Sequence, residues 1–273
     1  MSVKNILSVY PGLAGKQSAL KHAIKIAKLH GAWLTGVISH QGQSLAEGRF
    51  GGRLPPSILE ELQELDKKHL GEVKVEFERM MAENDLSERG EFMDLDQHEV
   101  SNLSSFARAF DLVVMSPHSS EPGESHISAH PDRVALEGGR PVLIVPNGYE
   151  ATGLADHALI AWDGKRAAAR ALGDAMHYLE TKPKVTILCV GKKATPGIDQ
   201  LLKSLDRHGV ETNLLIKSPE RSIGQTILTT LDEVGAKLLV MGAYEHSKFS
   251  QDLFGGVTHD VMQHCPVPLF LSH

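Results

Sequence analysis

The chain repeats its own plan, and this internal repeat constrains the fold more than any other feature of the sequence. The segment FDLVVMSPH (110–118) returns as AKLLVMGAYEH (236–246), and DRVALEGGRPVLIVP (132–146) returns as THDVMQHCPVPLFLS (258–272). The two pairs occur in the same order, which a short motif copied by chance would not produce. Self-similarity on this scale indicates a supersecondary unit used more than once. The 273 residues are therefore expected to form two similar domains.

The boundary between the copies is placed at PNGYEATGLAD (146–156), which contains turn residues and has no hydrophobic period. This division predicts a first domain at 1–148 and a second domain at 155–273. The openings of the two domains also match, since VKNILSVYPG and DHALIAWDG each precede an Ala-rich helical stretch.

Short β-branched runs alternate with helical periods in both halves. In the first half a long helix is expected at about 57–83, and in the second half Ser222 and Gln225 have the form of a capping box before another helix. Continuous apolar strands such as LLVM and VLIV suit a parallel sheet that is covered on both faces. Each half is predicted to be α/β, a doubly wound, five-stranded parallel sheet. The strands of the second half are expected near 157–162, 184–190, 211–216, 237–242 and 267–271.

Composition and charge exclude several classes of function. There are 28 Lys and Arg residues against 34 Asp and Glu residues, so no positive excess is present to neutralise a nucleic-acid backbone. The apolar runs are far shorter than the roughly 20 residues that span a bilayer, and the opening segment lacks the pattern of a signal peptide. Cys189 and Cys265 stand in apolar surroundings typical of buried, reduced thiols. We therefore expect a cytoplasmic protein with neither a nucleic-acid nor a membrane partner.

The loops after the strands of the second half carry groups that suit a ligand. Asp163 follows the first strand, where a carboxylate can accept hydrogen bonds from ribose hydroxyls or hold a metal near phosphates; it can equally cap the next helix. Gly255 and Gly256 precede the last helix, where backbone N–H groups and the helix dipole favour an anion.

In combination these features resemble a known family. The segment VMGAYEHSKFSQDLFGGVTHDVMQHCPVPLF is similar to the closing segment of the universal stress protein family. Its nucleotide-binding members have a glycine, two residues, a second glycine, nine residues, and then a glycine followed by Ser or Thr. The strand and helix plan extends the resemblance over both halves. It implies a tandem universal stress protein with two domains of the adenine nucleotide alpha hydrolase-like fold.

The resemblance also implies a site and a ligand. Gly242 matches the first glycine and Gly255 the third, Asp163 matches the acidic residue near the nucleotide, and Val190 lies where main-chain groups recognise adenine. The implied function is a stress-response sensor that binds ATP, ADP or AMP, with or without Mg²⁺, and that hydrolyses ATP slowly at most. The implied binding residues are Asp163, Val190, Gly242, His246, Ser247, Gly255, Gly256, Val257 and Thr258.

Two positions depart from the family pattern. Glu245 replaces the second glycine and Gly256 replaces the hydroxyl residue. A carboxylate about 5 Å from a phosphate charge is repelled by roughly 3 kcal/mol at an effective dielectric constant near 20, unless a cation or Lys248 offsets it. The first half departs further, because its first strand ends in Tyr10-Pro11-Gly12 and its fourth strand has no glycine ladder after it. The first half is therefore expected to bind no nucleotide.

Three alternatives remain open. A dedicated enzyme is disfavoured because the phosphate-loop, dinucleotide and nucleophile-elbow motifs are absent from the sequence. A zinc site at His118, His126 and His130 is a second interpretation, although the usual zinc-site spacings are absent and a solvated loop containing histidines is the commoner case. A protein-interaction module that uses the 40–56 loop is the third. The family resemblance further implies that the last strands of the two halves pair within the chain, and it leaves open the association of two chains into a homodimer.

Overall fold

The computed structural model describes residues 3–12, 17–38, 56–119, 129–150, 157–181, 184–243 and 256–273. The first half contains strands and helices in alternation. Its strands are β1 (Asn5–Val9), β2 (Trp33–Ile38), β3 (Gly90–Asp94), β4 (Leu112–Met115) and β5 (Val142–Ile144). Its helices are α1 (Ser18–His30), α3 (Pro56–Glu83), α4 (Leu103–Ala107) and α5 (Pro131–Glu137), with 3₁₀ turns at Ser87–Arg89 and Leu95–Gln97.

The second half repeats this alternation. Its strands are β6 (His157–Ala161), β7 (Lys184–Val190), β8 (Thr212–Lys217), β9 (Leu238–Gly242) and β10 (Leu269–Ser272). Its helices are α6 (Arg166–Leu179), α7 (Ile198–Arg207), α8 (Ile223–Glu233) and α9 (Val257–His264). The predicted strands lie within two residues of these bounds.

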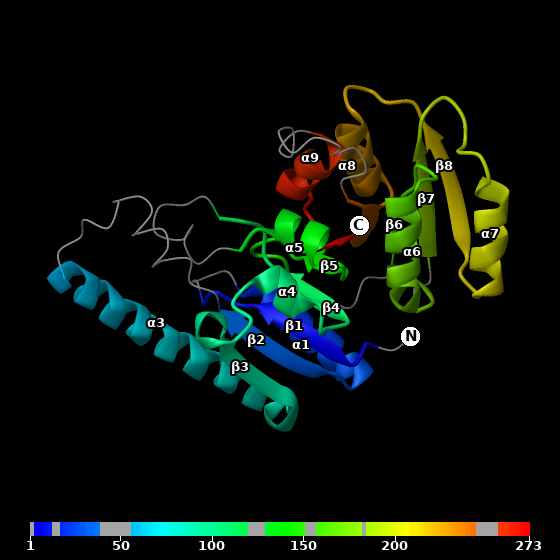
Figure 1. Cartoon of the computed structure of the whole chain (residues 1–273). Coiled ribbons are helices and arrows are strands. Elements are labelled where there is room, and N and C mark those ends of the chain that lie inside the picture. Colours follow the sequence, from blue (N-terminus) through cyan, green and yellow to red (C-terminus); the bar gives the residue numbers. More distant parts are fainter. Residues whose placement is uncertain are drawn as a thin grey trace.

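All ten strands belong to one sheet, in the order β3-β2-β1-β4-β5-β10-β9-β6-β7-β8. Each half contributes five parallel strands in the same order, and the strand order reverses between β1 and β4 and between β6 and β9. The predicted α/β class and doubly wound plan are confirmed. Figure 1 shows β3 and β8 at the two far ends of the sheet.

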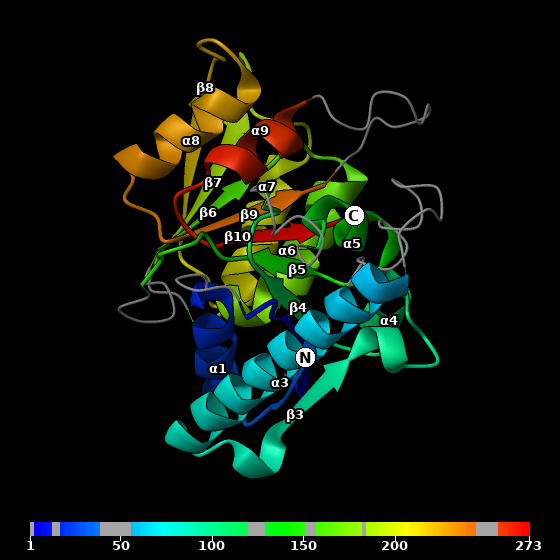
Figure 2. The ribbon, with the colours of Figure 1, turned by 90° about the vertical axis from the view of Figure 1, so that its left-hand side faces the viewer.

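The two five-stranded sheets join through their last strands. β5 pairs with β10 in the antiparallel direction, with Leu143 opposite Phe270. Figure 2 shows this pair in the middle of the molecule, with the elements of the first half below it and those of the second half above it. The pairing within the chain that the family resemblance implies is therefore present.

Hydrogen bonds at corresponding places support the internal repeat. The N–H of Tyr10 donates to the carbonyl of Val37, and that of Trp162 donates to the carbonyl of Leu188, each over 2.9 Å. Likewise the N–H of Asp111 donates to the carbonyl of Asn5 over 2.9 Å, and that of Lys237 donates to the carbonyl of His157 over 2.8 Å. The residues after β1 and after β6 thus occupy equivalent positions.

Helices cover both faces of the sheet and bury two apolar cores. One core lies beneath α1, α3, α6 and α7, and the other lies beneath α4, α5, α8 and α9. Strands such as Leu238–Gly242 are apolar along their length because side chains on both faces are buried. The two cysteines are free and buried, as predicted. Among the described helices, none has the length and apolarity needed to cross a bilayer.

Candidate functional site

The carboxyl edge of the second half brings most of the predicted site residues to one place. β6 and β9 are neighbours at the reversal of strand order, and Ala161 pairs with Met241. Asp163 follows β6, and Gly242 ends β9, so both lie at the edge where ligands of doubly wound sheets bind. Val190 ends β7, the strand on the other side of β6.

Asp163 shapes the turn that leads into α6. Its Oδ1 accepts a hydrogen bond of 3.0 Å from the backbone N–H of Lys165, and its Oδ2 lies 3.8 Å from Lys165 Nζ. The N-cap residue of α6 is Lys165. Asp163 lies two residues before it, so the alternative prediction that Asp163 caps this helix is wrong. The Asp163 side chain is 53% exposed, and a carboxylate accepts more than one hydrogen bond per oxygen. The same carboxylate can hold the turn and accept from a ligand.

The loop after β7 closes against this turn. Val190 is half-buried against the core beneath α8 and α9, and the N–H of Gly191 donates to the carbonyl of Lys217 over 2.7 Å. Gly164 has a φ of +77°, and a Cβ at that position would lie 3.3 Å from Thr195 Cβ. The main chain at the end of β7 and the turn after β6 therefore form one wall of the site.

Gly242 is a glycine for a packing reason. A Cβ placed on it would lie 2.4 Å from the carbonyl carbon of Ala167 and 2.5 Å from the nitrogen of Ala168. The backbone at the start of α6 therefore rests directly on the end of β9. The residue is needed to position α6, whether or not a ligand is bound.

The amino terminus of α9 lies beyond the end of β9. Gly256 is its N-cap residue, with a φ of +132° that favours glycine, and no described atom lies within 4 Å of where its Cβ would be. Val257 is half-buried, and the Thr258 side chain is buried. The side chains of Val257 and Thr258 are therefore at least partly covered by the protein.

Two residues near the site were not selected from the sequence. Trp162 stands directly before Asp163, and its buried Nε1 has no hydrogen-bond partner among the described residues. Asp260 lies in the first turn of α9, where its Oδ2 packs over Gly224 and its Oδ1 is 3.2 Å from His264 Nδ1. A tryptophan at the end of a strand and an acid in a first helical turn are too common to mark a site by sequence alone.

The predicted residues His246, Ser247 and Gly255, together with Glu245, lie outside the described residues. Their loop leaves from Ala243, whose N–H donates to the carbonyl of Ser272 over 2.8 Å. The carbonyl of Ala243 is also 2.8 Å from His273 Nδ1. The start of the loop is thus held at the carboxyl edge, beside the end of β10.

The equivalent edge of the first half is covered by α3. Pro11 takes the position of Asp163, and its carbonyl is 3.0 Å from His69 Nε2. A Cβ on Gly12 would lie 2.1 Å from Val73 Cγ2, so this side chain fills the space over the turn. These side chains of α3 stand over the end of β1 where the second half has its turn at Asp163.

The described histidines of the proposed zinc site do not converge on one ion. The rings of His118 and His130 stack with centroids 3.8 Å apart and an angle of 22°. Nitrogen lone pairs lie in the ring plane, so nearly parallel stacked rings do not direct them to a common point. Burial, and next the neighbouring His118, lower the pKa of His130. His126 lies outside the described residues, within which no group of three metal-binding side chains occurs.

Comparisons with known proteins give a family match for part of the chain and a fold match for the whole chain. Residues 198–273 match the model of the universal stress protein family. A search of curated proteins finds no match. A universal stress protein from Archaeoglobus fulgidus DSM 4304 superposes with a TM-score of 0.73 at 17% identity, covering 98% of this chain and 96% of the other.

Two further solved structures are similar. One, from Pseudomonas aeruginosa UCBPP-PA14 and assigned to the universal stress proteins, has a TM-score of 0.59 at 15% identity and covers 99% of this chain and 93% of the other. The other is a universal stress protein in complex with cAMP, with a TM-score of 0.35 at 21% identity, covering 44% of this chain and 97% of the other. At these identities the likeness establishes the fold alone.

Proposed function

Because residues 198–273 match the model of the universal stress protein family and the whole chain has the fold of a solved universal stress protein, we propose that the second half binds an adenine nucleotide as a sensor in a stress response. In this proposal the domains are 1–148 and 155–273, and the protein is cytoplasmic. The first half binds no nucleotide and supports the second. No residue is assigned a catalytic role.

The observation that carries the proposal is the meeting of three elements at the reversal of strand order. The half-exposed carboxylate of Asp163, the end of β7 at Val190 and the amino terminus of α9 at Gly256 all border the carboxyl edge of the sheet. A carboxylate suits ribose hydroxyls, main-chain groups suit the adenine edge, and helix N–H groups suit phosphate.

The phosphate end of the site carries unfavourable charge. Asp260 occupies the first turn of α9, where its carboxylate already interacts with the positive end of the helix dipole. Its contacts with Gly224 and His264 turn it toward α8 and along its own helix. With Glu245 in the adjoining loop, a divalent cation such as Mg²⁺ would offset repulsion from the phosphates. We therefore propose that nucleotides with more phosphates depend more strongly on Mg²⁺.

The test is a calorimetric and thermal-shift titration with ATP, ADP and AMP, each with and without Mg²⁺. A ligand at 100 times its dissociation constant stabilises the folded state by about 2.7 kcal/mol, which raises the melting temperature measurably. The absence of any shift at millimolar nucleotide would overturn the proposal and favour an interaction module.

Asp163→Asn is the sharpest variant for the same titration. The amide oxygen still accepts from the N–H of Lys165, so the turn is preserved while the negative charge is lost. We expect nucleotide affinity to fall about tenfold with the melting temperature of the free protein unchanged. Asp206→Asn, on the exposed side of α7, is the matched control and should leave affinity unchanged. Equal affinity in the two variants would remove Asp163 from the site.

A further inference from the structure

The helix α3 has an anchored part and an exposed part. Figure 1 shows its amino-terminal end extending beyond the sheet. The described contacts of α3 with the rest of the first half begin at His69, whose Nε2 lies 3.0 Å from the carbonyl oxygen of Pro11, and continue with the buried Val73 and Phe77. Before His69, every side chain of the helix that the structure describes is exposed, namely those of Ser57, Ile58, Glu61, Glu64, Leu65, Lys67 and Lys68.

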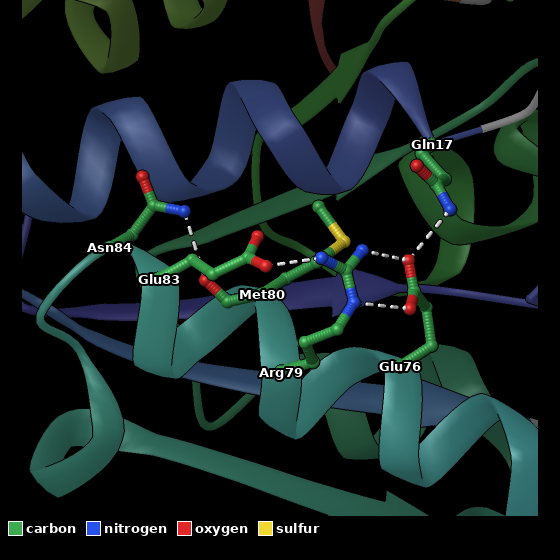
Figure 3. A network of polar contacts seen from close by, with 6 residues as sticks. All are labelled: Gln17, Glu76, Arg79, Met80, Glu83 and Asn84. Atoms are coloured by element: carbon green, nitrogen blue, oxygen red, sulfur yellow. Dashed lines mark hydrogen bonds and ion pairs between the residues drawn. The ribbon is translucent and has the colours of Figure 1, made fainter.

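The anchored part of α3, residues 69–83, is also held by a polar network. Gln17 Nε2 donates to Glu76 over 3.1 Å, and Arg79 donates to Glu76 from Nε over 2.8 Å and from Nη2 over 2.7 Å. The same guanidinium donates from Nη1 to Glu83. Figure 3 shows these side chains on the side of α3 that faces α1. The exposed part, residues 57–68, therefore continues from a fixed base.

The exposed part carries apolar residues in a stripe at helical spacing. Ile58 and Leu65 are 43% and 58% exposed and lie two turns apart, and the sequence places Leu62 between them on the same face. Alternating steps of four and three residues are the spacing of a coiled-coil seam. Because a helix of this length is marginal in water unless an apolar face is packed, the 58–65 stripe suits a partner helix.

The charges along this part of α3 change sign. Residues 57–66 contain four acidic residues and no basic one, whereas residues 67–74 contain three lysines and one glutamate. Glu61 and Lys68 lie seven residues apart and flank the 58–65 stripe on the same side, and both are exposed. Within the described part of the chain Glu61 makes no ion pair, and Lys68 lies 3.9 Å from Glu72 on the surface. Such an exposed pair contributes little, so both charges are available to a partner.

Two copies of this helix complement each other when they run antiparallel. Leu65 of one copy then lies beside the partner's Leu62, and Glu61 lies beside the partner's Lys68, with the reciprocal pairs formed by twofold symmetry. In a parallel arrangement the two acidic segments would lie side by side and repel each other. The paired stretch ends where His69 meets the first half, so the remainder of each copy lies at opposite ends of the pair.

We propose that the 58–65 stripe of α3 binds a second copy of this chain, so that the two helices form a short antiparallel coiled coil. This contact is distinct from the pairing of β5 with β10, which lies within one chain. It uses none of the residues of the proposed nucleotide site, so the two proposals stand independently. A contact of a few helical turns is smaller than a standard protein interface, and we expect a dissociation constant of about 10–100 µM.

The test is sedimentation equilibrium of the whole protein from about 5 µM to about 500 µM, in which the mass should rise from one chain toward two. Leu65→Glu should weaken the association more than about tenfold, because it places a carboxylate in an apolar seam. Val75→Glu is the matched control, since Val75 is 65% exposed on the anchored part of the same helix, and it should change the association less than about twofold. Both positions are exposed, so both variants are expected to fold, which a melting curve checks.

Charge reversal tests the antiparallel direction. Glu61→Lys brings two lysines together in each flanking pair, and Lys68→Glu brings two carboxylates together, so each substitution alone should weaken the association about three- to tenfold at low salt. The double variant restores opposite charges in both pairs and should associate like the wild type. A parallel pair, or a partner other than this helix, would not be rescued in this way.

Three results would overturn the proposal. One is the mass of a single chain at every concentration up to about 500 µM. Another is a dimer that Leu65→Glu leaves intact, which would assign the association to a different surface. The third is a double charge variant that associates no better than the single variants, which would exclude the antiparallel pairing.

Discussion

Gly242 shows how one residue can be selected by packing and by a ligand motif at once. Its position matches the first glycine of the family motif, yet the backbone of Ala167 and Ala168 already leaves no room for a Cβ there. Gly256 is different, because its φ of +132° favours glycine while no described atom lies within 4 Å of the place where its Cβ would be. Of the two glycines, Gly242 is the one that packing against described residues explains.

Gly242→Ala is expected to destabilise the protein by about 1–3 kcal/mol, because the methyl group collides with backbone atoms that cannot rotate away. Gly173→Ala is the matched control, because Gly173 lies in α6, the helix whose first turn packs on Gly242. A Cβ there meets no described atom, and alanine is favoured over glycine within a helix by about 0.5–1 kcal/mol. Urea denaturation measures both. Equal stability of Gly242→Ala and the wild type would contradict the packing role.

The candidate site could be predicted from the sequence only where a residue follows its own strand. Asp163, Val190 and Gly242 lie at the carboxyl edge because each ends or follows a strand, and parallel strands end together. The hydrogen bond from Lys165 to Asp163, the buried N–H of Trp162 and the contacts of Asp260 depend on packing between elements distant in the sequence. Periodicity carries no information about such contacts.

At the scale of elements, α3 packs closely on the first half because glycines beneath it leave space for its side chains. The Phe77 ring occupies the space over Gly36, where a Cβ would lie 2.4 Å from Phe77 Cε2, and it packs 5.4 Å from the ring of Phe92. Val73 fills the corresponding space over Gly12. The carboxyl-terminal part of α3 is therefore anchored to the protein through the buried side chains of Val73 and Phe77.

Phe77→Ala is expected to lower the free energy of unfolding by about 3–5 kcal/mol, because it removes a fully buried ring and leaves a cavity. Val75→Ala, on the exposed side of the same helix, should change it by less than about 0.5 kcal/mol. Gly36→Ala should be destabilising alone but much less so when combined with Phe77→Ala, since the ring it collides with is gone. Additive effects of the two substitutions would show that they do not share this contact.

Some helix and strand ends are determined by capping residues or prolines that the sequence shows directly. The hydroxyl of Ser222 accepts from the N–H of Gln225 over 3.0 Å, as the predicted cap requires. The side chain of Gln225 instead reaches Thr229 Oγ1, so the reciprocal half of the capping box does not form. β10 begins two residues later than predicted because Pro268 has no N–H for the ladder.

At the scale of the molecule, the repeat predicts two domains, whereas the pairing of their last strands into one sheet is expected from the family resemblance alone. The pairing of β5 with β10 is a long-range contact, and neither strand encodes its partner or direction. The same junction brings α1 of the first half against α6 of the second, with the rings of His30 and His177 centred 5.8 Å apart. Tyr178 lies beside both rings and packs against Phe270 of β10.

This contact between the halves contains polar atoms that are buried without partners. His30 Nε2, His177 Nε2 and the Tyr178 hydroxyl have none among the described residues. Burial, and next the proximity of His30, lower the pKa of His177 to about 4, although a hydrogen bond to the backbone of Asp174 and the charge of Glu180 act in the opposite direction. Burial, and next Lys4, also lower the pKa of His30. The interface is therefore built for neutral imidazoles.

Stability is expected to fall as the pH is lowered from about 6.5 to about 4. In this range the unfolded chain binds a proton at His177 while the folded chain resists it, so protonation favours unfolding. Above about pH 6.5 both states are neutral and the dependence vanishes. Because the ring is only partly buried, we expect His177 to contribute no more than about 1–2 kcal/mol.

The substitution His177→Phe tests whether protonation of His177, at the contact between the two halves, lowers stability at acid pH. The phenyl ring retains the aromatic packing but cannot be protonated, so stability measured by urea denaturation should fall less steeply between pH 6.5 and 4 than in the wild type. A residual slope is expected from the lowered pKa values of His30, His130 and His157. His264→Gln, at an exposed position on α9, should retain the wild-type slope. If the slopes of His177→Phe and the wild type coincide, protonation at this interface does not govern the acid sensitivity of the fold.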